Sequence, residues 1–438
     1  MKNWLNHRLS EDCFIRFNKK QYSFQNIGDT VYDRTLSLID FGVKKGDKIA
    51  LFLPEALDFI EAYLACYKIQ SPSIILNHKW RQNELRNALE TVPPDFIVCS
   101  YKHKSLFLEF KKPIIFIEEL SKSFGSCHAN EIDDSINKEA IQSILFTSGT
   151  QGFSKPVCLT YDNFYQSSIK WKKAIDLNKN DKYLLSLPLY HVSGLAIIMR
   201  SLHLGFSVNI NNAPAGISDS TVFSAVPTLL TELLKDEKNI NDLQKIRCIV
   251  LSGSKASQTL LAKCKKHNLN IFLSYGMTET CSSICGFWPF KEQEHNVKIV
   301  GKPFEGVKIK VINNQIFIES NTVMKKYFNG NLTNGEFATS DKGSFENNFL
   351  TLNGRLDDIV ISGGENVNPS EVVEAIASIA KFDKIITFKK EDSYWGEILG
   401  VYIYTNQKID SDYIKSKLGS IISKHKIPKE IVIKKPEV

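Results

Sequence analysis

The sequence predicts an α/β protein with a large N-terminal domain of mostly parallel sheets plus a small barrel-like part, and a small mobile C-terminal α+β domain. Three observations predict this fold. Short apolar runs alternate with helical patterns through the first three quarters of the chain, short alternating strands follow Phe304, and the last eighty or so residues begin with a strong helix-start pattern.

The apolar runs of the first part are rich in β-branched and aromatic residues, which favour strands. The run 48–53 ends at Pro54 and is followed by a helical pattern over 56–67. Such alternation of strand and helix is typical of parallel sheets covered by helices. Further strands are predicted at 96–99, 113–117, 247–251 and 271–273.

The pattern of apolar and polar residues changes after Phe304. Residues 308–312 and 315–318 alternate apolar and polar side chains on either side of Asn313-Asn314, a turn-prone pair. This spacing predicts a tight antiparallel hairpin in a barrel-like part of the molecule.

A helix is predicted to start the C-terminal domain. Asn368 can cap it, Pro369 suits its first position, and Glu371 can reach back as in a capping box. Strands at 384–388 and 398–404 and a second amphipathic helix follow. We therefore predict an N-terminal domain over 1–354 and a lid over 355–438. The apolar faces of the two helices are formed by Val372, Val373, Ile376 and Ile379, and by Ile414, Leu418, Ile421 and Ile422.

Composition excludes several classes of protein. The chain of 438 residues is 43% hydrophobic and 24% charged, as expected for a globular protein of more than one domain. Its formal net charge of +7 is dispersed rather than gathered into a stripe, which favours small anionic ligands over nucleic acid. No signal-like or membrane-spanning apolar run occurs, so we expect no transmembrane segment and a cytoplasmic location.

The nine cysteines do not predict a metal site or a disulfide framework. No Cys-x-x-Cys pair occurs, and Cys281 and Cys285 lack a second pair at metal-ligand spacing. Cys99 and Cys248 lie inside apolar runs, so buried reduced thiols are expected.

The most informative segment runs from 144 to 155. An apolar strand leads into Thr147-Ser148-Gly149-Thr150-Gln151-Gly152-Phe153-Ser154-Lys155, where backbone N–H groups, hydroxyls and one lysine can bind phosphate. The spacing is not that of a Walker A loop. Taken alone, this segment also fits an ordinary turn.

Four more segments carry chemistry-bearing residues in polar turns. They are Ser274-Tyr275-Gly276-Met277-Thr278-Glu279, Thr339-Ser340-Asp341, Gly354-Arg355-Leu356-Asp357-Asp358, and Leu187-Pro188-Leu189-Tyr190-His191-Val192-Ser193-Gly194-Leu195. A carboxylate such as Glu279 suits Mg²⁺, which binds hard oxygen ligands and phosphates. Each acidic residue alone would be an ordinary turn former.

Together and in this order, the segments resemble the signatures of the adenylate-forming enzymes over nearly the whole chain. The departures are Gln151, Ser154 and Ser340, which replace a threonine, a proline and a glycine of the usual patterns. The resemblance implies a phosphate site formed by Thr147, Ser148, Gly149, Thr150, Gly152 and Lys155.

The same resemblance implies further nucleotide contacts. Tyr275 and Gly276 would border adenine, Thr278 would meet the α-phosphate, Glu279 would help to hold Mg²⁺, and Asp341 would accept both ribose hydroxyls. Arg355 would contact ribose or phosphate, Asp357 would be the hinge, and Gly363 and Gly364 would line a tunnel for the pantetheine arm of CoA.

Within the superfamily, the segment around His191 most resembles the o-succinylbenzoate-CoA ligases of menaquinone biosynthesis. This resemblance implies that His191, Ser193 and Gly194 meet the acid and that Arg200 holds its second carboxylate. A guanidinium suits a planar carboxylate through two parallel hydrogen bonds. From the residues alone, His191 also fits a satisfied core histidine, and Arg200 a solvated helix arginine.

The resemblance implies an ATP-dependent, AMP-forming acid:CoA ligase that uses ATP, Mg²⁺ and coenzyme A, with His191, Lys155, Thr278 and Glu279 in catalytic roles. The alternatives are another aryl- or fatty-acid CoA ligase, an adenylation-deficient adenylate-binding protein, and a domain that loads a carrier protein. A homodimer is left open.

The family's terminal Gly-Lys segment is expected to be missing. Residues 426–433 match the approach to that segment, but the sequence ends at Val438. The lysine serves adenylation in the family, so its loss would slow that half-reaction more than thioester formation.

Overall fold

Two large sheets share one apolar core in the computed structural model, which describes residues 1–8, 10–120, 135–147, 155–211, 213–292, 296–356 and 359–435. The first sheet has seven strands. In spatial order they are β18 (Lys326–Tyr327), β8 (Lys155–Thr160), β7 (Ile141–Thr147), β4 (Ser73–Ile75), β3 (Ile49–Phe52), β5 (Phe96–Cys99) and β6 (Ile114–Phe116). The run from β7 to β6 is parallel.

The second sheet has thirteen strands. In spatial order they are β16 (Lys308–Ile312), β17 (Gln315–Glu319), β19 (Glu336–Glu346), β20 (Phe349–Arg355), β15 (Ile299–Pro303), β14 (Ser282–Phe287), β13 (Ile271–Met277), β12 (Cys248–Leu251), β11 (Val222–Ala225), β9 (Lys182–Leu184), β10 (Ser207–Ile210), β1 (Cys13–Phe17) and β2 (Lys20–Ser23). The run from β13 to β1 is parallel, and the strands on either side of it are antiparallel.

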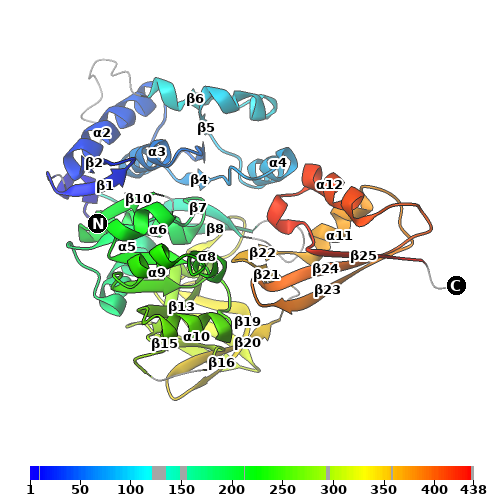
Figure 1. The fold of residues 1–438 in the computed structure, drawn as a ribbon. Helices are drawn as coiled ribbons and strands as arrows, with labels where there is room; N and C mark the ends of the chain where they lie inside the picture. The colour runs from blue at the N-terminus through cyan, green and yellow to red at the C-terminus, as the bar shows by residue number, and fades with distance from the viewer. Residues whose placement is uncertain are drawn as a thin grey trace.

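Helices form layers between and outside the two sheets (Figure 1). The helices are α1 (Trp4–His7), α2 (Phe24–Asp40), α3 (Ala56–Ile69), α4 (Gln82–Thr91), α5 (Tyr161–Ile175), α6 (Val192–Leu204), α7 (Ala213–Gly216), α8 (Pro227–Leu233), α9 (Glu237–Leu243) and α10 (Gln258–Lys266). Alternate side chains of one strand reach opposite layers: Leu51 of β3 joins the core shared by the two sheets, whereas Ala50 packs with the layer of α4. Strands buried on both faces explain why the sequence shows continuous apolar runs.

The tight hairpin predicted at Asn313-Asn314 joins β16 and β17. Both asparagines have positive φ angles, 49° and 65°, and Ile312 pairs with Gln315 across the turn. Asparagine tolerates this left-handed conformation, which two-residue hairpins require.

The thirteen-stranded sheet is strongly curled. Four strand spacings separate β13 from β19, which would be about 19 Å in a flat sheet. The hydroxyl of Tyr275 in β13 nevertheless lies 2.5 Å from Oδ2 of Asp341 in β19. Register shifts in β13, β15 and β19 accompany the curl, since bulges increase local twist.

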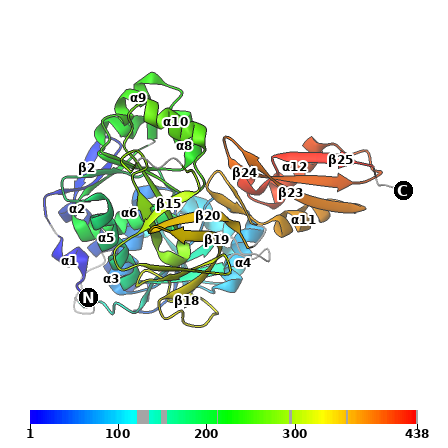
Figure 2. The ribbon, with the colours of Figure 1, turned by 90° about the horizontal axis from the view of Figure 1, so that it is seen from below.

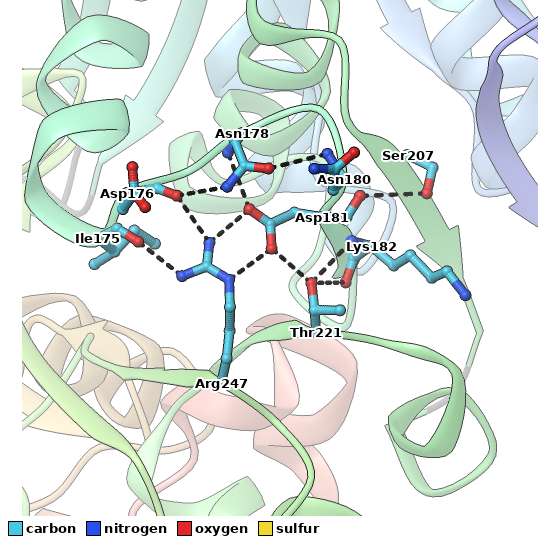
Figure 3. A network of polar contacts seen from close by, with 9 residues as sticks. All are labelled: Ile175, Asp176, Asn178, Asn180, Asp181, Lys182, Ser207, Thr221 and Arg247. Atoms are coloured by element: carbon cyan, nitrogen blue, oxygen red, sulfur yellow. Dashed lines mark hydrogen bonds and ion pairs between the residues drawn. The ribbon is translucent and has the colours of Figure 1, made fainter.

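A partly buried ion pair fixes the start of β9, with the Asp181 side chain 4% exposed and that of Arg247 35% exposed (Figure 3). Asp181 accepts from Nε and Nη2 of Arg247 at 2.6 and 2.5 Å and from the Thr221 hydroxyl at 2.7 Å. Arg247 also donates to the carbonyl of Ile175 at the end of α5, at 2.8 Å. Through this network, the end of α5 is joined to the residues that directly precede β9, β11 and β12.

The small C-terminal α+β domain has its own apolar core (Figures 1 and 2). Its elements are β21 (Val360–Ser362), β22 (Glu365–Val367), α11 (Pro369–Ala377), β23 (Lys384–Asp392), β24 (Gly396–Tyr404), α12 (Ser411–Ile421), η7 (Lys424–Lys426) and β25 (Glu430–Lys434). Strands β23 and β24 are longer than predicted because they form one hairpin around residues 393–395. The boundary between residues 354 and 355 stays a prediction.

Asn368 caps α11, as predicted, by accepting from the backbone N–H of Ser370 at 2.9 Å. The carboxylate of Glu371, for which the sequence suggests a capping role, forms an ion pair with Lys426. Among the helices of the described ranges, none is long and apolar enough to cross a membrane.

Candidate active site

A cleft of about 1040 Å³ lies where the ends of the sheet strands face the C-terminal domain. Of the candidate site residues that the structure describes, all except Gly194 line it. They are Thr147, Lys155, His191, Ser193, Arg200, Tyr275, Gly276, Thr278, Glu279, Asp341, Arg355, Gly363 and Gly364. Segments far apart in the sequence thus meet at one site.

The predicted phosphate loop is flanked by two paired strands. Thr147 ends β7, Lys155 begins β8, and the two residues are register partners. The residues between them, which include the candidates Ser148, Gly149, Thr150 and Gly152, lie outside the described residues. The strands hold Thr147 and Lys155 at the wall of the cleft, where both can face an anion.

Glu279 lies in η6 (Thr278–Thr280), a short turn at the end of β13. Its carboxylate accepts a hydrogen bond from the Tyr327 hydroxyl at 2.9 Å, and the ammonium group of Lys155 lies 5.7 Å from the centre of the Tyr327 ring. Burial raises the pKa of Glu279 despite this hydrogen bond. A bound cation would favour the ionised form, because an adjacent positive charge opposes the effect of burial.

Asp341 accepts from two residues at once. The Tyr275 hydroxyl lies 2.5 Å from Oδ2, and Nη1 of Arg355 lies 2.8 Å from Oδ1. Burial and the neighbouring carboxylate raise the pKa of Tyr275 well above its usual value, so the phenol stays a donor. The three residues, predicted from three separate motifs, form one fixed polar cluster.

Gly276 follows Tyr275 in β13, and Thr278 begins η6 two residues later. A Cβ atom on Gly276 would lie 2.2 Å from the carbonyl oxygen of Ser282, so the close approach of β13 and β14 requires glycine. Thr278 is half-buried at the cleft wall. The turn therefore presents the Thr278 hydroxyl and the Glu279 carboxylate side by side.

His191 immediately precedes α6 and is partly exposed, so it is not a satisfied core histidine. Its Nε2 lies 3.1 Å from Oε1 of Glu365 in the C-terminal domain. Burial opposes ionisation of Glu365, but the hydrogen bond and charge of His191 outweigh it and lower the pKa of that carboxyl to about 2. Gly194 lets the helix pack closely, since a Cβ there would lie 2.3 Å from the carbonyl oxygen of Pro188.

Arg200, on α6, is 2% exposed, so it is not a solvated helix arginine. Its Nη2 donates to the Ser282 hydroxyl at 2.7 Å, and its guanidinium carbon lies 4.6 Å from the centre of the Trp171 ring. Among the residues that the structure describes, none accepts a hydrogen bond from Nε. Within the described ranges no carboxylate forms an ion pair with Arg200, and burial lowers its pKa to about 10.

The loop that joins β21 to β22 approaches the N-terminal part closely. Gly364 has a φ of +87°, and a Cβ atom there would lie 2.9 Å from Cγ1 of Val226. The Gly363 N–H donates to the carbonyl of Trp395 at 2.8 Å. The candidate hinge residue, Asp357, lies outside the described residues.

Sequence patterns did not identify Tyr327, Trp171 or Glu365 as site residues. Trp171 sits at a helical spacing that also fits the core, and Tyr327 lies in a two-residue strand with no motif of its own. Glu365 directly follows the glycine pair at 363–364, and its place next to this candidate CoA-binding pair could have identified it as a site residue.

The arrangement separates two kinds of polar group. Lys155, Thr278, Glu279 and the Asp341 cluster can bind the phosphates and ribose of a nucleotide. Arg200 is a buried cation at the cleft wall that can bind a carboxylate. No group of three or more metal-ligating side chains occurs in the described part of the chain. A single carboxylate at Glu279 fits Mg²⁺, which completes its coordination with phosphate oxygens and water.

Comparison with known proteins identifies a family. Residues 3–328 match the model of the AMP-binding enzymes. The 2-succinylbenzoate-CoA ligase of Bacillus subtilis strain 168 is 29% identical over 98% of this chain and 93% of its own.

Two solved structures from Bacillus subtilis differ in how well they superpose. A double mutant of o-succinylbenzoate CoA synthetase bound to its product analogue OSB-NCoA has a TM-score of 0.90 at 27% identity and covers 100% of this chain and 96% of its own. The same synthetase with ATP and magnesium has a TM-score of 0.76 at 27% identity and covers 99% and 95%.

Proposed function

Since the chain belongs to the AMP-binding enzyme family, we propose that it is an ATP-dependent acid:CoA ligase whose acid is o-succinylbenzoate. The observation that carries the choice of acid is Arg200, a buried cation in the cleft without a carboxylate partner in the described ranges. A buried charge is costly unless it is paired. An acid with a second carboxylate supplies that pair.

The reaction has two halves. The carboxylate oxygen of the acid attacks the α-phosphorus of ATP, the bond to the β-phosphate oxygen breaks, and pyrophosphate leaves. The CoA sulfur, having lost its proton, then attacks the acyl carbon, the bond to the adenylate oxygen breaks, and AMP leaves. Both halves develop negative charge in a confined site, so fixed cations and hydrogen-bond donors supply much of the catalysis.

We assign the phosphate contacts to Lys155, Thr147 and Thr278, together with the loop residues 148–152. Their cation, hydroxyls and backbone N–H groups would hold the phosphates in line for attack. Glu279 would hold Mg²⁺, which neutralises phosphate charge when bound. The nearby Tyr327 hydroxyl would orient the Glu279 carboxylate.

The ribose and adenine contacts are assigned to Asp341, Arg355, Tyr275 and Gly276. Asp341 would accept the ribose hydroxyls on a carboxylate that Tyr275 and Arg355 already orient. Such orientation before binding lowers the entropy lost when the nucleotide is held.

The acid would lie between the nucleotide and Arg200, with His191 and Ser193 at its reactive end, whereas Gly194 would serve the packing of α6. CoA would enter along Gly363 and Gly364. The second half-reaction requires a narrow path there for the pantetheine arm of CoA. His191 faces Glu365 in this arrangement, so we assign it an orienting role.

The test is an assay of pyrophosphate release and CoA-thioester formation with o-succinylbenzoate, benzoate and a fatty acid. We expect thioester with o-succinylbenzoate and little with the others. Preference for benzoate or the fatty acid would identify another CoA ligase, and transfer only to a carrier protein would identify a loading domain. Nucleotide binding without any product would identify an adenylate-binding protein. A cytoplasmic location stays a prediction, which fractionation tests, and light scattering would decide the oligomeric state.

A further inference from the structure

A buried lysine joins the C-terminal domain to α4. Nζ of Lys426, in η7, lies 2.7 Å from Oε1 of Glu84 and 2.6 Å from Oε1 of Glu371. The three side chains are 8%, 11% and 17% exposed. Three charges thus share one nearly dry site.

The two carboxylates come from different parts of the fold. Glu371 lies on α11, in the same C-terminal domain as Lys426, whereas Glu84 lies in the first turn of α4. Figure 1 shows α4 beside the C-terminal elements. Ser423 also donates to Oε2 of Glu84 at 2.5 Å. Glu84 therefore receives two hydrogen bonds from across the interface.

The contact with Glu84 can open without leaving Lys426 unpaired. Glu371 would stay beside Lys426 when the C-terminal domain moves, while the carboxylate of Glu84 would become solvated. Burial lowers the pKa of Lys426, but the two carboxylates raise it by more. The pKa is therefore raised overall, and the lysine stays charged at neutral pH. The interaction with Glu84 thus belongs to the interface and not to the C-terminal core.

The groups proposed for the CoA half-reaction lie at the same interface. Next to Lys426, His425 lines the cleft, and Glu365 of the adjacent strand pairs with His191. Gly364 meets Val226 nearby. Of the two Bacillus synthetase structures described above, the one that holds the product analogue superposes with the higher TM-score.

We propose that Lys426 and Glu84 are a positioning pair that holds the C-terminal domain in the arrangement for thioester formation. This inference rests on the proposed ligase function. Lys426 lines the cleft, but its ammonium group is held by the carboxylates of Glu84 and Glu371. The pair acts by holding the glycine loop and Glu365 in place, so its loss should slow the second half-reaction and spare the first.

The variant Glu84→Gln removes the interfacial charge and retains a side chain that can cap α4, where Glu84 accepts from the Arg81 N–H at 2.8 Å. Glu84→Lys reverses the charge. We expect single-turnover conversion of bound acyl-adenylate by CoA to fall at least about tenfold with Glu84→Lys and less with Glu84→Gln. Pyrophosphate release without CoA should stay within about twofold of wild type.

Glu109→Gln is the matched control, because Glu109 pairs with Arg86 of α4 at 2.6 Å but is exposed and is not a partner of Lys426. It should leave both rates unchanged. Equal slowing of both half-reactions by Glu84→Lys would show a general loss of fold, and unchanged rates would show that the pair does not position the domain. Either outcome overturns the proposal.

A second measurement does not depend on activity. A donor and an acceptor dye on non-canonical amino acids at the exposed positions Asn87 and Ser416 report the separation of α4 and α12. We expect Glu84→Lys to reduce the population with high energy transfer, whereas Glu109→Gln does not. An unchanged population overturns the positioning role of Lys426 and Glu84, whichever acid the enzyme uses. A reduced population in a protein that is inactive with o-succinylbenzoate would reject only the proposed acid substrate.

Discussion

The guanidinium of Arg200 stacks over the ring of Trp171, with 4.6 Å between the guanidinium carbon and the ring centre. This contact fixes a buried cation at the wall of the cleft. We expect Arg200→Met, which keeps most of the side-chain volume, to weaken binding of o-succinylbenzoate by ten- to a hundredfold, or ~1.5–3 kcal/mol. Turnover of a monocarboxylate such as benzoate should change little. The KM for each acid measures the effect, and equal changes would contradict the assignment.

Replacement of the carboxylate at Glu279 tests the nucleotide end of the cleft. Glu279→Gln keeps the size of the side chain but removes the anionic oxygen that suits Mg²⁺. We expect pyrophosphate release to fall at least about a hundredfold, since each ~1.4 kcal/mol of lost transition-state stabilisation is tenfold. Circular dichroism should show an unchanged fold. Magnesium-dependent release at the wild-type rate would refute the metal assignment.

The hydroxyl of Tyr275 should orient Asp341 for ribose. Tyr275→Phe removes this donor and leaves the ion pair between Asp341 and Arg355 in place. Loss of one hydrogen bond is worth ~1 kcal/mol, so the Kd for ATP should rise about fivefold. Titration calorimetry with ATP and with a 2′,3′-dideoxy analogue tests this. The analogue should bind both proteins with similar affinity, and an equal loss for both nucleotides would show that Tyr275 acts elsewhere.

The Asp181–Arg247 network should stabilise the fold without taking part in catalysis. Arg247→Met leaves the buried Asp181 without its cation, and we expect a loss of about 2–3 kcal/mol in the free energy of unfolding. Denaturant titration measures it. Lys245→Met is the control, because the side chain of that lysine is 68% exposed in its pair with Asp242.

The same network predicts a pH dependence. Burial opposes ionisation of Asp181, but its hydrogen bonds with Arg247, the N–H of Asn178 and Thr221 lower its pKa. A lowered folded pKa means that the stabilisation is complete above the unfolded value of about 3.9 and is lost as the pH falls through the folded value. The difference in unfolding free energy between wild type and Asp181→Asn should therefore be largest near pH 7 and shrink toward about pH 3. A constant difference would contradict this origin.

Local patterns in the sequence predicted the elements and motifs that depend on neighbouring residues. The hairpin at Asn313-Asn314 and the cap at Asn368 follow from preferences of single turns, and both are confirmed. The candidate nucleotide-site residues Tyr275, Glu279 and Asp341 each lie in a short motif, so the family resemblance predicted them, and their roles stay predictions.

Contacts between distant segments were not predictable in this way. Glu365 meets His191 across 174 positions, and Lys426 meets Glu84 across 342. Glu371 illustrates the difference: its position favours a local cap, but tertiary packing brings a buried lysine to its carboxylate. No local periodicity encodes such partners, because they depend on how the two domains pack.

The curl of the thirteen-stranded sheet determines which strands a bound nucleotide would stabilise against fraying. Tyr275 and Asp341 face one another because a single hydrogen-bonded ladder bends back on itself between them. A nucleotide held by both residues would reinforce the hydrogen bond that already links β13 and β19. Fraying of β14 or β15 would then have to overcome the binding of the ligand as well as the strand pairs, so two strands to which no nucleotide contact is assigned would become harder to open once it is bound.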